Sequence, residues 1–213
     1  MGEILQLLFP ERCVGCGHAH ALLCKRCSRE WGYPITNTIE DVPLISSAFY
    51  SESISHIVLK AKENNDRRCR RILANAIASH ISETETLIPI PSSPSSIRRR
   101  GFDHALLLAE EVVRLTGSSL WHGLRVNRKI QDQTKLNHSA RFANLSGAYS
   151  FLSGNSGNEL PPNVVVIDDL VTTGASMREA IRVIRSEKGA EMRPIKAISA
   201  CIASHHLPNT ISP

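Results

Sequence analysis

Short apolar segments alternate with amphipathic and polar ones along most of the 213-residue chain. Runs rich in branched aliphatic residues predict strands at 43–50, 86–91, 118–126, 148–152, 164–167 and 195–202. Between them, residues 53–81 predict a helical stretch that breaks at 64–66, and residues 102–115 and 175–188 predict two further helices, ended by Gly117 and Gly189. Alternating strands and helices indicate βαβ units, so we expect an α/β fold with a parallel sheet flanked by helices.

Residues 1–35 form a separate cysteine-bearing head, and residues 36–213 hold the alternating strands and helices. Four cysteines of the head occur as two pairs, each with two residues between its members: Cys13, Cys16, Cys24 and Cys27. Two such pairs can give four thiolates to one tetrahedral Zn²⁺ ion and leave no open position, which is typical of a structural site. Four free thiols are the alternative, but so short a segment has no core of its own. His18 and His20 lie between the pairs and could replace a cysteine.

Composition fits this architecture and narrows the class of partner. Hydrophobic residues make up 42% of the chain and aromatic residues 5%, so aliphatic side chains must fill the core, as they do around parallel sheets. The formal net charge of +5 favours anionic partners, which include phosphates, nucleic acid and acidic lipid headgroups. We interpret the arginines at 67–71 as part of a solvated face, and those at 98–100 as candidates for binding an anion.

No membrane-spanning segment is predicted, because no stretch of 18 or more apolar residues occurs. The apolar start, residues 1–9, is short, contains Glu3 and lacks a basic leader, so it is unlike a secretory signal. We therefore expect a cytoplasmic protein. In that compartment, closely paired cysteines are more often metal ligands than disulfides.

The segment 164–184 carries the most specific pattern. An aliphatic strand is followed by two adjacent acids and then by a loop of small residues that leads into an amphipathic helix. The loop consists of Thr172, Thr173, Gly174, Ala175 and Ser176. At the carboxyl end of a parallel strand, such a loop points N–H groups and hydroxyls into a concavity, and the next helix adds its positive dipole end. We interpret it as a phosphate-binding loop; an ordinary turn and helix start is the alternative.

The two acids, Asp168 and Asp169, would repel a phosphate unless they face another group. Ribose hydroxyls can donate hydrogen bonds to both carboxylates. A Mg²⁺ ion, held directly or through water, would also reduce their mutual repulsion. The acid pair therefore predicts a ligand that combines a phosphate with a sugar diol, and Mg²⁺ as a cofactor.

A second polar segment follows the predicted strand at 86–91. A loop of prolines and serines over 91–96 leads to Arg98, Arg99 and Arg100, which directly precede Gly101 and the predicted helix. The planar fork of arginine suits phosphate oxygens. The alternative is a solvated run at a helix start, where the dipole disfavours positive charge. We therefore favour contact with a diphosphate group.

The strand, acid pair and Thr-Thr-Gly loop together resemble the signature of the type I phosphoribosyltransferases. The segment 99–105, Arg-Arg-Gly-Phe-Asp-His-Ala, resembles the Arg-Gly-Phe-Asn-Gln-Ala segment of the ComF/GntX family, which joins a zinc-binding head to a phosphoribosyltransferase domain. Asp103 and His104 stand where that family usually has Asn and Gln. The segment 128–149 is similar to the family's Arg…Gln…Leu…Arg…Asn…Gly-Ala-Phe pattern, so the resemblance covers nearly the whole chain.

The resemblance implies a type I phosphoribosyltransferase-like fold with a small four-cysteine zinc head. The loop 172–176 would bind the 5′-phosphate of phosphoribosyl diphosphate, and Asp168 and Asp169 would bind the ribose hydroxyls. Residues 127–147 would form a loop that closes over the substrates, with contacts from Arg128, Gln133 and Arg141. Residues 36–85 would form a hood that selects the acceptor.

Two functions remain open at this point. An enzyme would transfer the phosphoribosyl group to an acceptor nucleophile and release diphosphate, with Mg²⁺ bound and with Asp168 and Asp169 helping through their charge. A non-catalytic accessory protein of competence and DNA uptake, to which ComF relatives are linked, would use the fold to bind a nucleotide or single-stranded DNA, or would contact the competence machinery. No motif in the sequence specifies the acceptor.

Overall fold

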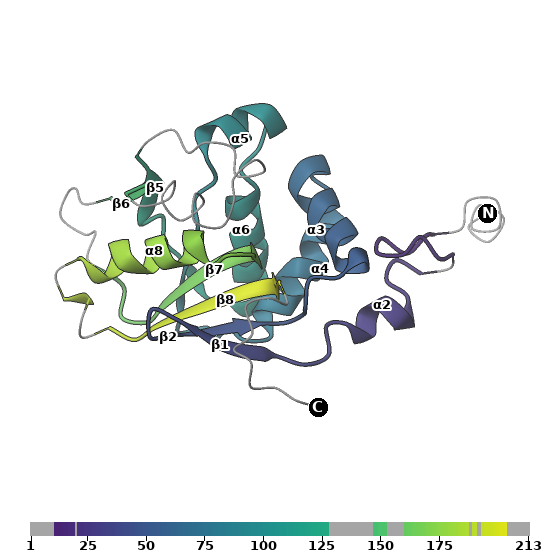
Figure 1. Cartoon of the computed structure of the whole chain (residues 1–213), viewed down its shortest axis with the longest axis horizontal. Coiled ribbons are helices and arrows are strands. Elements are labelled where there is room, and N and C mark those ends of the chain that lie inside the picture. The colour runs from purple at the N-terminus through teal and green to yellow at the C-terminus, as the bar shows by residue number, and fades with distance from the viewer. Residues whose placement is uncertain are drawn as a thin grey trace.

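A six-stranded sheet in the order β1-β2-β8-β7-β3-β4 organises the chain (Figure 1). The computed structural model describes residues 11–19, 21–127, 147–152, 160–187, 189–190 and 193–203. The strands of this sheet are β1 (Ile35–Ile39), β2 (Val42–Ser46), β3 (Thr86–Pro89), β4 (Ser119–Leu120), β7 (Val164–Val171) and β8 (Ile195–Ile202). Neighbouring strands are parallel except β1, which pairs with β2 as an antiparallel hairpin. The predicted α/β class with a mostly parallel sheet is confirmed.

The described helices are α2 (Lys25–Arg29), α3 (Glu52–Asn64), α4 (Arg67–Ala78), α5 (Pro94–Arg100), α6 (His104–Thr116) and α8 (Ala175–Arg185). The predicted break at 64–66 is confirmed. Asn65 ends α3 in the left-handed conformation (φ 54°), and Asp66 then caps α4 by accepting hydrogen bonds from two backbone N–H groups of its first turn. Among the described residues, no helix combines the length and apolar character needed to cross a bilayer.

The central strand β7 is buried on both faces, which explains its continuous aliphatic run. Val164 and Val166 join a core with α8 and with the small hairpin of β5 (Leu124–Val126) and β6 (Tyr149–Phe151). Val165 and Ile167 join a second core with α3, α4 and α6. Because side chains alternate along a strand, the next two residues of β7, Asp168 and Asp169, also lie on opposite faces of the sheet.

Two local predictions were wrong. The predicted strand at 118–126 is two strands in different sheets, since β4 pairs with β3 and β5 pairs with β6. Residues 94–96 of the predicted loop and the three arginines form α5, which Ser93 caps. The arginines therefore lie in the last turn of a helix, where the dipole favours positive charge, and the dipole argument against a solvated run does not apply. The strand predicted at 43–50 is present as β2, although the sequence interpretation missed its partner β1.

Candidate ligand-binding site and metal centre

A cavity of about 620 Å³ lies at the carboxyl ends of β3 and β7. Residues from α3, α5, α6, β6, β7 and the start of α8 line it. Its charged and titratable side chains include Lys62, Arg99, Arg100, His104, Asp168 and Asp169. In an open α/β sheet this edge is the usual place for a ligand, and here the fold brings together residues that are more than 100 positions apart in the sequence.

The predicted phosphate-binding loop forms a small cup of about 20 Å³ beside this cavity. Asp168 and residues 170–177 line the cup, so all five predicted loop residues meet there. Gly174 caps α8 in the left-handed conformation (φ 69°), and an added Cβ would lie 3.1 Å from Ile39 Cδ1. Thr173 is buried, and its Oγ1 accepts a hydrogen bond from Ala175 N at 3.4 Å. The loop thus has the turn and the helix start that an anion site requires.

The two acids have different surroundings. Asp169 is 3% exposed and faces the core of α3, α4 and α6, where Lys62 Nζ lies 2.9 Å from its Oδ2 and 3.2 Å from its Oδ1. His104 Nε2 lies 3.2 Å from the same Oδ2. Asp168 is half-buried, accepts a hydrogen bond from the N–H of Asp169 at 2.8 Å, and lines both the cup and the cavity. Asp168 is therefore the acid that a ligand can reach from both sides.

These surroundings shift the two carboxyl pKa values in opposite directions. Burial, together with the neighbouring charge of Asp169, raises the pKa of Asp168 well above its ordinary value. Burial acts in the same direction on Asp169, but the positive charge of Lys62 and the contact with His104 outweigh it and hold the pKa of Asp169 well below its ordinary value. A divergent pair of this kind is typical of a functional site, although structural ion pairs also produce it.

The structure brings two of the three predicted arginines to the cavity. Arg99 donates to the Glu63 carboxylate at 2.6 and 3.3 Å, and Arg100 Nη1 lies 3.8 Å from the same side chain. Arg100 is also 6.0 Å from the ring centroid of Phe102, a cation–π contact. Arg98 is exposed and is not among the residues that line the cavity. The carboxylate of Glu63 thus pairs with both of the arginines that we expected to contact a diphosphate group.

The sequence interpretation missed Lys62 and His104 as site residues, and it left Glu63 out. A signal was present, because Lys62 continues the buried spacing of Ile54 and Val58 on α3. His104 likewise stands four residues before the buried Leu108 on α6. An ionisable residue that continues an apolar stripe at a helix end requires a buried partner. Predicted contacts Arg128, Gln133 and Arg141 lie outside the described residues.

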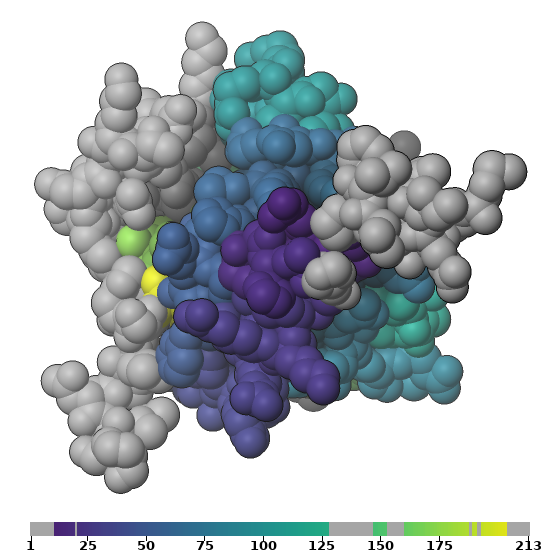
Figure 2. Space-filling view, turned by 90° about the vertical axis from the view of Figure 1, so that its right-hand side faces the viewer, coloured from purple at the N-terminus to yellow at the C-terminus, as the bar shows by residue number. Residues whose placement is uncertain are grey.

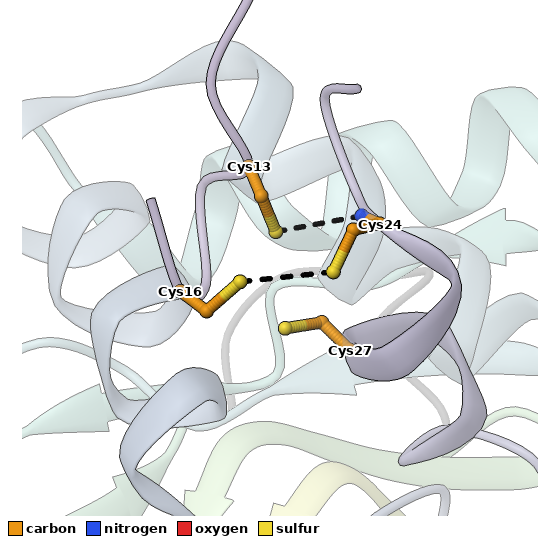
Figure 3. A group of neighbouring side chains, drawn as sticks. All are labelled: Cys13, Cys16, Cys24 and Cys27. Atoms are coloured by element: carbon orange, nitrogen blue, oxygen red, sulfur yellow. Dashed lines mark hydrogen bonds between the residues drawn. The ribbon is translucent and has the colours of Figure 1, made fainter. Parts of the chain in front are cut away.

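The four predicted zinc ligands come together in the head (Figure 3). Their Sγ atoms all lie within 4.8 Å of one another, and those of Cys16 and Cys24 are 3.6 Å apart. Zn–S bonds of about 2.3 Å place tetrahedral sulfurs about 3.8 Å apart, so the cluster fits one Zn²⁺ ion. Cys24 N donates to Cys13 Sγ at 3.4 Å. Although burial opposes it, this and other backbone N–H donors lower the pKa of Cys13 to about 6, whereas burial and the neighbouring thiols raise the pKa of Cys27.

The head packs against α3 (Figure 2). His56 donates to Gly15 O at 2.6 Å, and Lys60 donates to Val14 O at 3.0 Å. A Cβ on Gly15 would lie 3.2 Å from Cys27 Sγ and 3.3 Å from Ser53 O, so the cysteine loop approaches the helix closely. The helix that carries Lys62 into the cavity is thus also the one that holds the cysteine loop.

Comparison with known proteins gives two similar proteins, and no protein-family model matches the chain. The chain is 27% identical over 180 residues to the Haemophilus influenzae protein named Competence protein F, with 76% of this chain and 78% of that protein covered. It is 28% identical over 188 residues to the Bacillus subtilis protein named Competence protein ComFC, with 83% of this chain and 72% of that protein covered. Similarity over most of the chain supports the ComF family and a competence-related protein.

Proposed function

We propose that this chain binds phosphoribosyl diphosphate with Mg²⁺ at the carboxyl edge of its sheet and transfers the phosphoribosyl group to an acceptor. The observation that carries the proposal is the position of Asp168, which lines both the cup of loop 172–176 and the cavity that Arg99 and Arg100 line. A 5′-phosphate in the cup would place its ribose beside Asp168. The diphosphate at the other end of the sugar would then point toward the arginines.

Asp168 provides a carboxylate that could bind the proposed Mg²⁺ ion. Asp168 offers a half-buried carboxylate that opens to the cavity, whereas both oxygens of Asp169 already meet Lys62. Mg²⁺ in phosphate-processing sites is commonly bound by one or two carboxylates together with phosphates of the substrate. When bound, it would supply positive charge to the diphosphate, and Asp168 is the described residue that would hold it.

In the proposed transfer, the bond between the anomeric carbon and the diphosphate oxygen breaks, and diphosphate leaves with the electron pair. The acceptor forms the new bond and releases its proton to solvent. Positive charge that develops on the ribose would meet the carboxylate of Asp168, and negative charge on the leaving group would meet Arg99 and Arg100. Holding both ends of the substrate would supply much of the rate enhancement. Glu63, which lies in the proposed 36–85 hood, also lines this cavity.

A second candidate is a non-catalytic accessory protein of competence that binds a nucleotide or single-stranded DNA. The names of both similar proteins, Competence protein F and Competence protein ComFC, favour it. The head supports it as well, because Lys25 and Arg26 expose positive charge there and Tyr33 is 84% exposed. Exposed aromatic rings and cations are the usual means of binding single strands.

Calorimetric titration of the zinc-loaded protein with phosphoribosyl diphosphate and Mg²⁺ tests the first candidate. We expect saturable binding that Asp168→Asn abolishes while the thermal unfolding of the variant stays cooperative. Release of diphosphate in the presence of acceptor mixtures would then identify the protein as a transferase. A folded wild-type protein that does not bind the ligand would refute the proposal. Tight, strongly salt-dependent binding of single-stranded DNA would then favour the second candidate.

A further inference from the structure

The ion pair between Lys62 and Asp169 is buried on one side only. Asp169 is 3% exposed, whereas the Lys62 side chain keeps 37% of its surface exposed. Both carboxylate oxygens lie within 3.2 Å of the Lys62 ammonium, which has three N–H donors. Lys62 also lines the large cavity. The lysine therefore lies between a buried anion and an open space, with donor capacity left for a second anion.

We propose that Lys62 is a ligand-binding residue that contacts the diphosphate part of the ligand, and that Asp169 acts as the positioning residue that holds it. This inference rests on the proposed function and deepens it. It assigns different tasks to the two acids, since Asp168 meets the sugar and Asp169 acts through Lys62.

The position of Lys62 relative to the two parts of the site supports the diphosphate as its target. Lys62 lines the cavity with Arg99 and Arg100, and its carbonyl oxygen accepts a hydrogen bond from Arg100 Nη1 at 3.5 Å. The cup of loop 172–176 is lined by Asp168 and residues 170–177, with no contribution from α3 among the described residues. Lys62 thus belongs to the arginine end of the site and not to the end proposed for the 5′-phosphate.

The charges around the cavity show why a lysine is needed there. Glu63 pairs with both arginines, and Asp169 lies behind Lys62. Without the lysine, the buried carboxylate of Asp169 would face an incoming diphosphate with His104 as its remaining partner. Lys62 thus attracts the diphosphate and also reduces the repulsion between the diphosphate and Asp169. Removal of Lys62 should therefore weaken diphosphate binding for both reasons.

A neutral pair tests the proposal without leaving a buried charge unpaired. In Lys62→Met/Asp169→Asn, both charges are removed together, and Lys62→Arg keeps the cation. Arg71→Met is the control, because Arg71 is an exposed cation of the neighbouring helix α4 that is not among the residues lining the cavity. Each protein is titrated by calorimetry with phosphoribosyl diphosphate and Mg²⁺, and separately with ribose 5-phosphate, which lacks the diphosphate.

The double variant should bind phosphoribosyl diphosphate about tenfold more weakly or worse, as expected for loss of a charged hydrogen bond. Its affinity for ribose 5-phosphate should stay within about twofold of wild type. Lys62→Arg should restore much of the loss, and Arg71→Met should match wild type. Equal losses for both ligands would overturn the inference, because they would indicate a general structural role or a direct contact of Asp169 with ribose.

The two proposals fail in distinguishable ways. If wild type binds phosphoribosyl diphosphate and the double variant binds it equally well, the role of Lys62 is wrong and the proposed function stands. If a folded wild type binds neither ligand, the proposed function is wrong, and the role of Lys62 fails with it.

Discussion

Replacing the two neighbouring acids with asparagine should change the stability of the protein in opposite directions. Asp169→Asn removes the charge that faces Lys62 and His104 in the interior, so it should destabilise the fold. Asp168→Asn removes a charge whose ionised form is disfavoured by burial and by Asp169. The second variant should therefore melt at or above the temperature of wild type. Replacing a residue whose placement destabilises the fold but serves binding often raises the stability of a protein.

The expected size of the first effect follows from the burial of the pair. Removing one partner of a buried ion pair costs about 3–5 kcal/mol. Because the Lys62 side chain is 37% exposed and can be solvated in part, the lower end of that range, about 3 kcal/mol, applies. In a chain of this size, 1 kcal/mol corresponds to about 2–4 °C in Tm. Asp169→Asn should therefore unfold about 6–12 °C below wild type.

The pH dependence separates the two acids further. The pKa of Asp169 is lowered in the folded state, so its stabilising contribution is present above the ordinary carboxyl pKa of about 3.9 and is lost as the pH falls below it. The pKa of Asp168 is raised in the folded state, so its contribution is most favourable below about pH 3.9 and is lost as the pH rises through its raised value. The advantage of Asp168→Asn over wild type should thus be largest at neutral pH and shrink in mild acid.

Thermal unfolding followed by circular dichroism, at neutral pH and in mild acid, measures both effects in the absence of ligand. Asp103→Asn is a suitable control. Asp103 is the N-cap of α6, and the side-chain oxygen of an asparagine at this position can accept the same two hydrogen bonds from backbone N–H groups. Equal losses of Tm for Asp168→Asn and Asp169→Asn would refute the reasoning. So would a destabilised Asp168→Asn variant, because its carboxylate would then be stabilised by the fold.

Three further predictions concern single groups. Glu63→Gln removes the carboxylate that pairs with the two arginines, so calorimetry should show diphosphate binding about two- to tenfold tighter; unchanged or weaker binding would contradict this. Gly174→Ala places a side chain at φ 69° and against Ile39, which should cost about 1–2 kcal/mol in unfolding free energy and weaken ribose 5-phosphate binding; wild-type affinity would argue against the cup. Cys27→Ser should lower the zinc content measured by mass spectrometry, as well as the Tm, and full zinc retention would exclude a four-cysteine site.

Much of the fold could be predicted because its elements have strong local signals. β8 lies at the predicted 195–202, and β7 begins at the predicted residue 164. The break between α3 and α4 follows from Asn65 and Asp66, which favour a left-handed cap and an N-cap. The cysteine spacing predicted a cluster that the structure assembles. In each case a few adjacent residues determine the outcome.

Other features depend on tertiary contacts and so could not be predicted. The run of five apolar residues at 105–109 does not determine which face of α6 is buried. Within this run Leu108 and Ala109 are buried, whereas Ala105, Leu106 and Leu107 are partly exposed. The buried face also includes His104. Likewise, no local pattern places Lys62 beside Asp169, because the two residues are 107 positions apart in the sequence.

The bonds between the head and α3 have a consequence for how affinities of this protein are measured. His56 and Lys60 hold the cysteine loop, and Lys62 lies six residues beyond His56 on α3, about 9 Å along the helix axis. We expect α3 to move as one body, so that displacement of the cysteine loop would shift the ammonium that Asp169 holds. Thermodynamic linkage would make such an effect reciprocal. If the head binds a metal ion and the cavity binds the proposed ligand, metal content would then alter ligand affinity, and each should be measured at a stated level of the other.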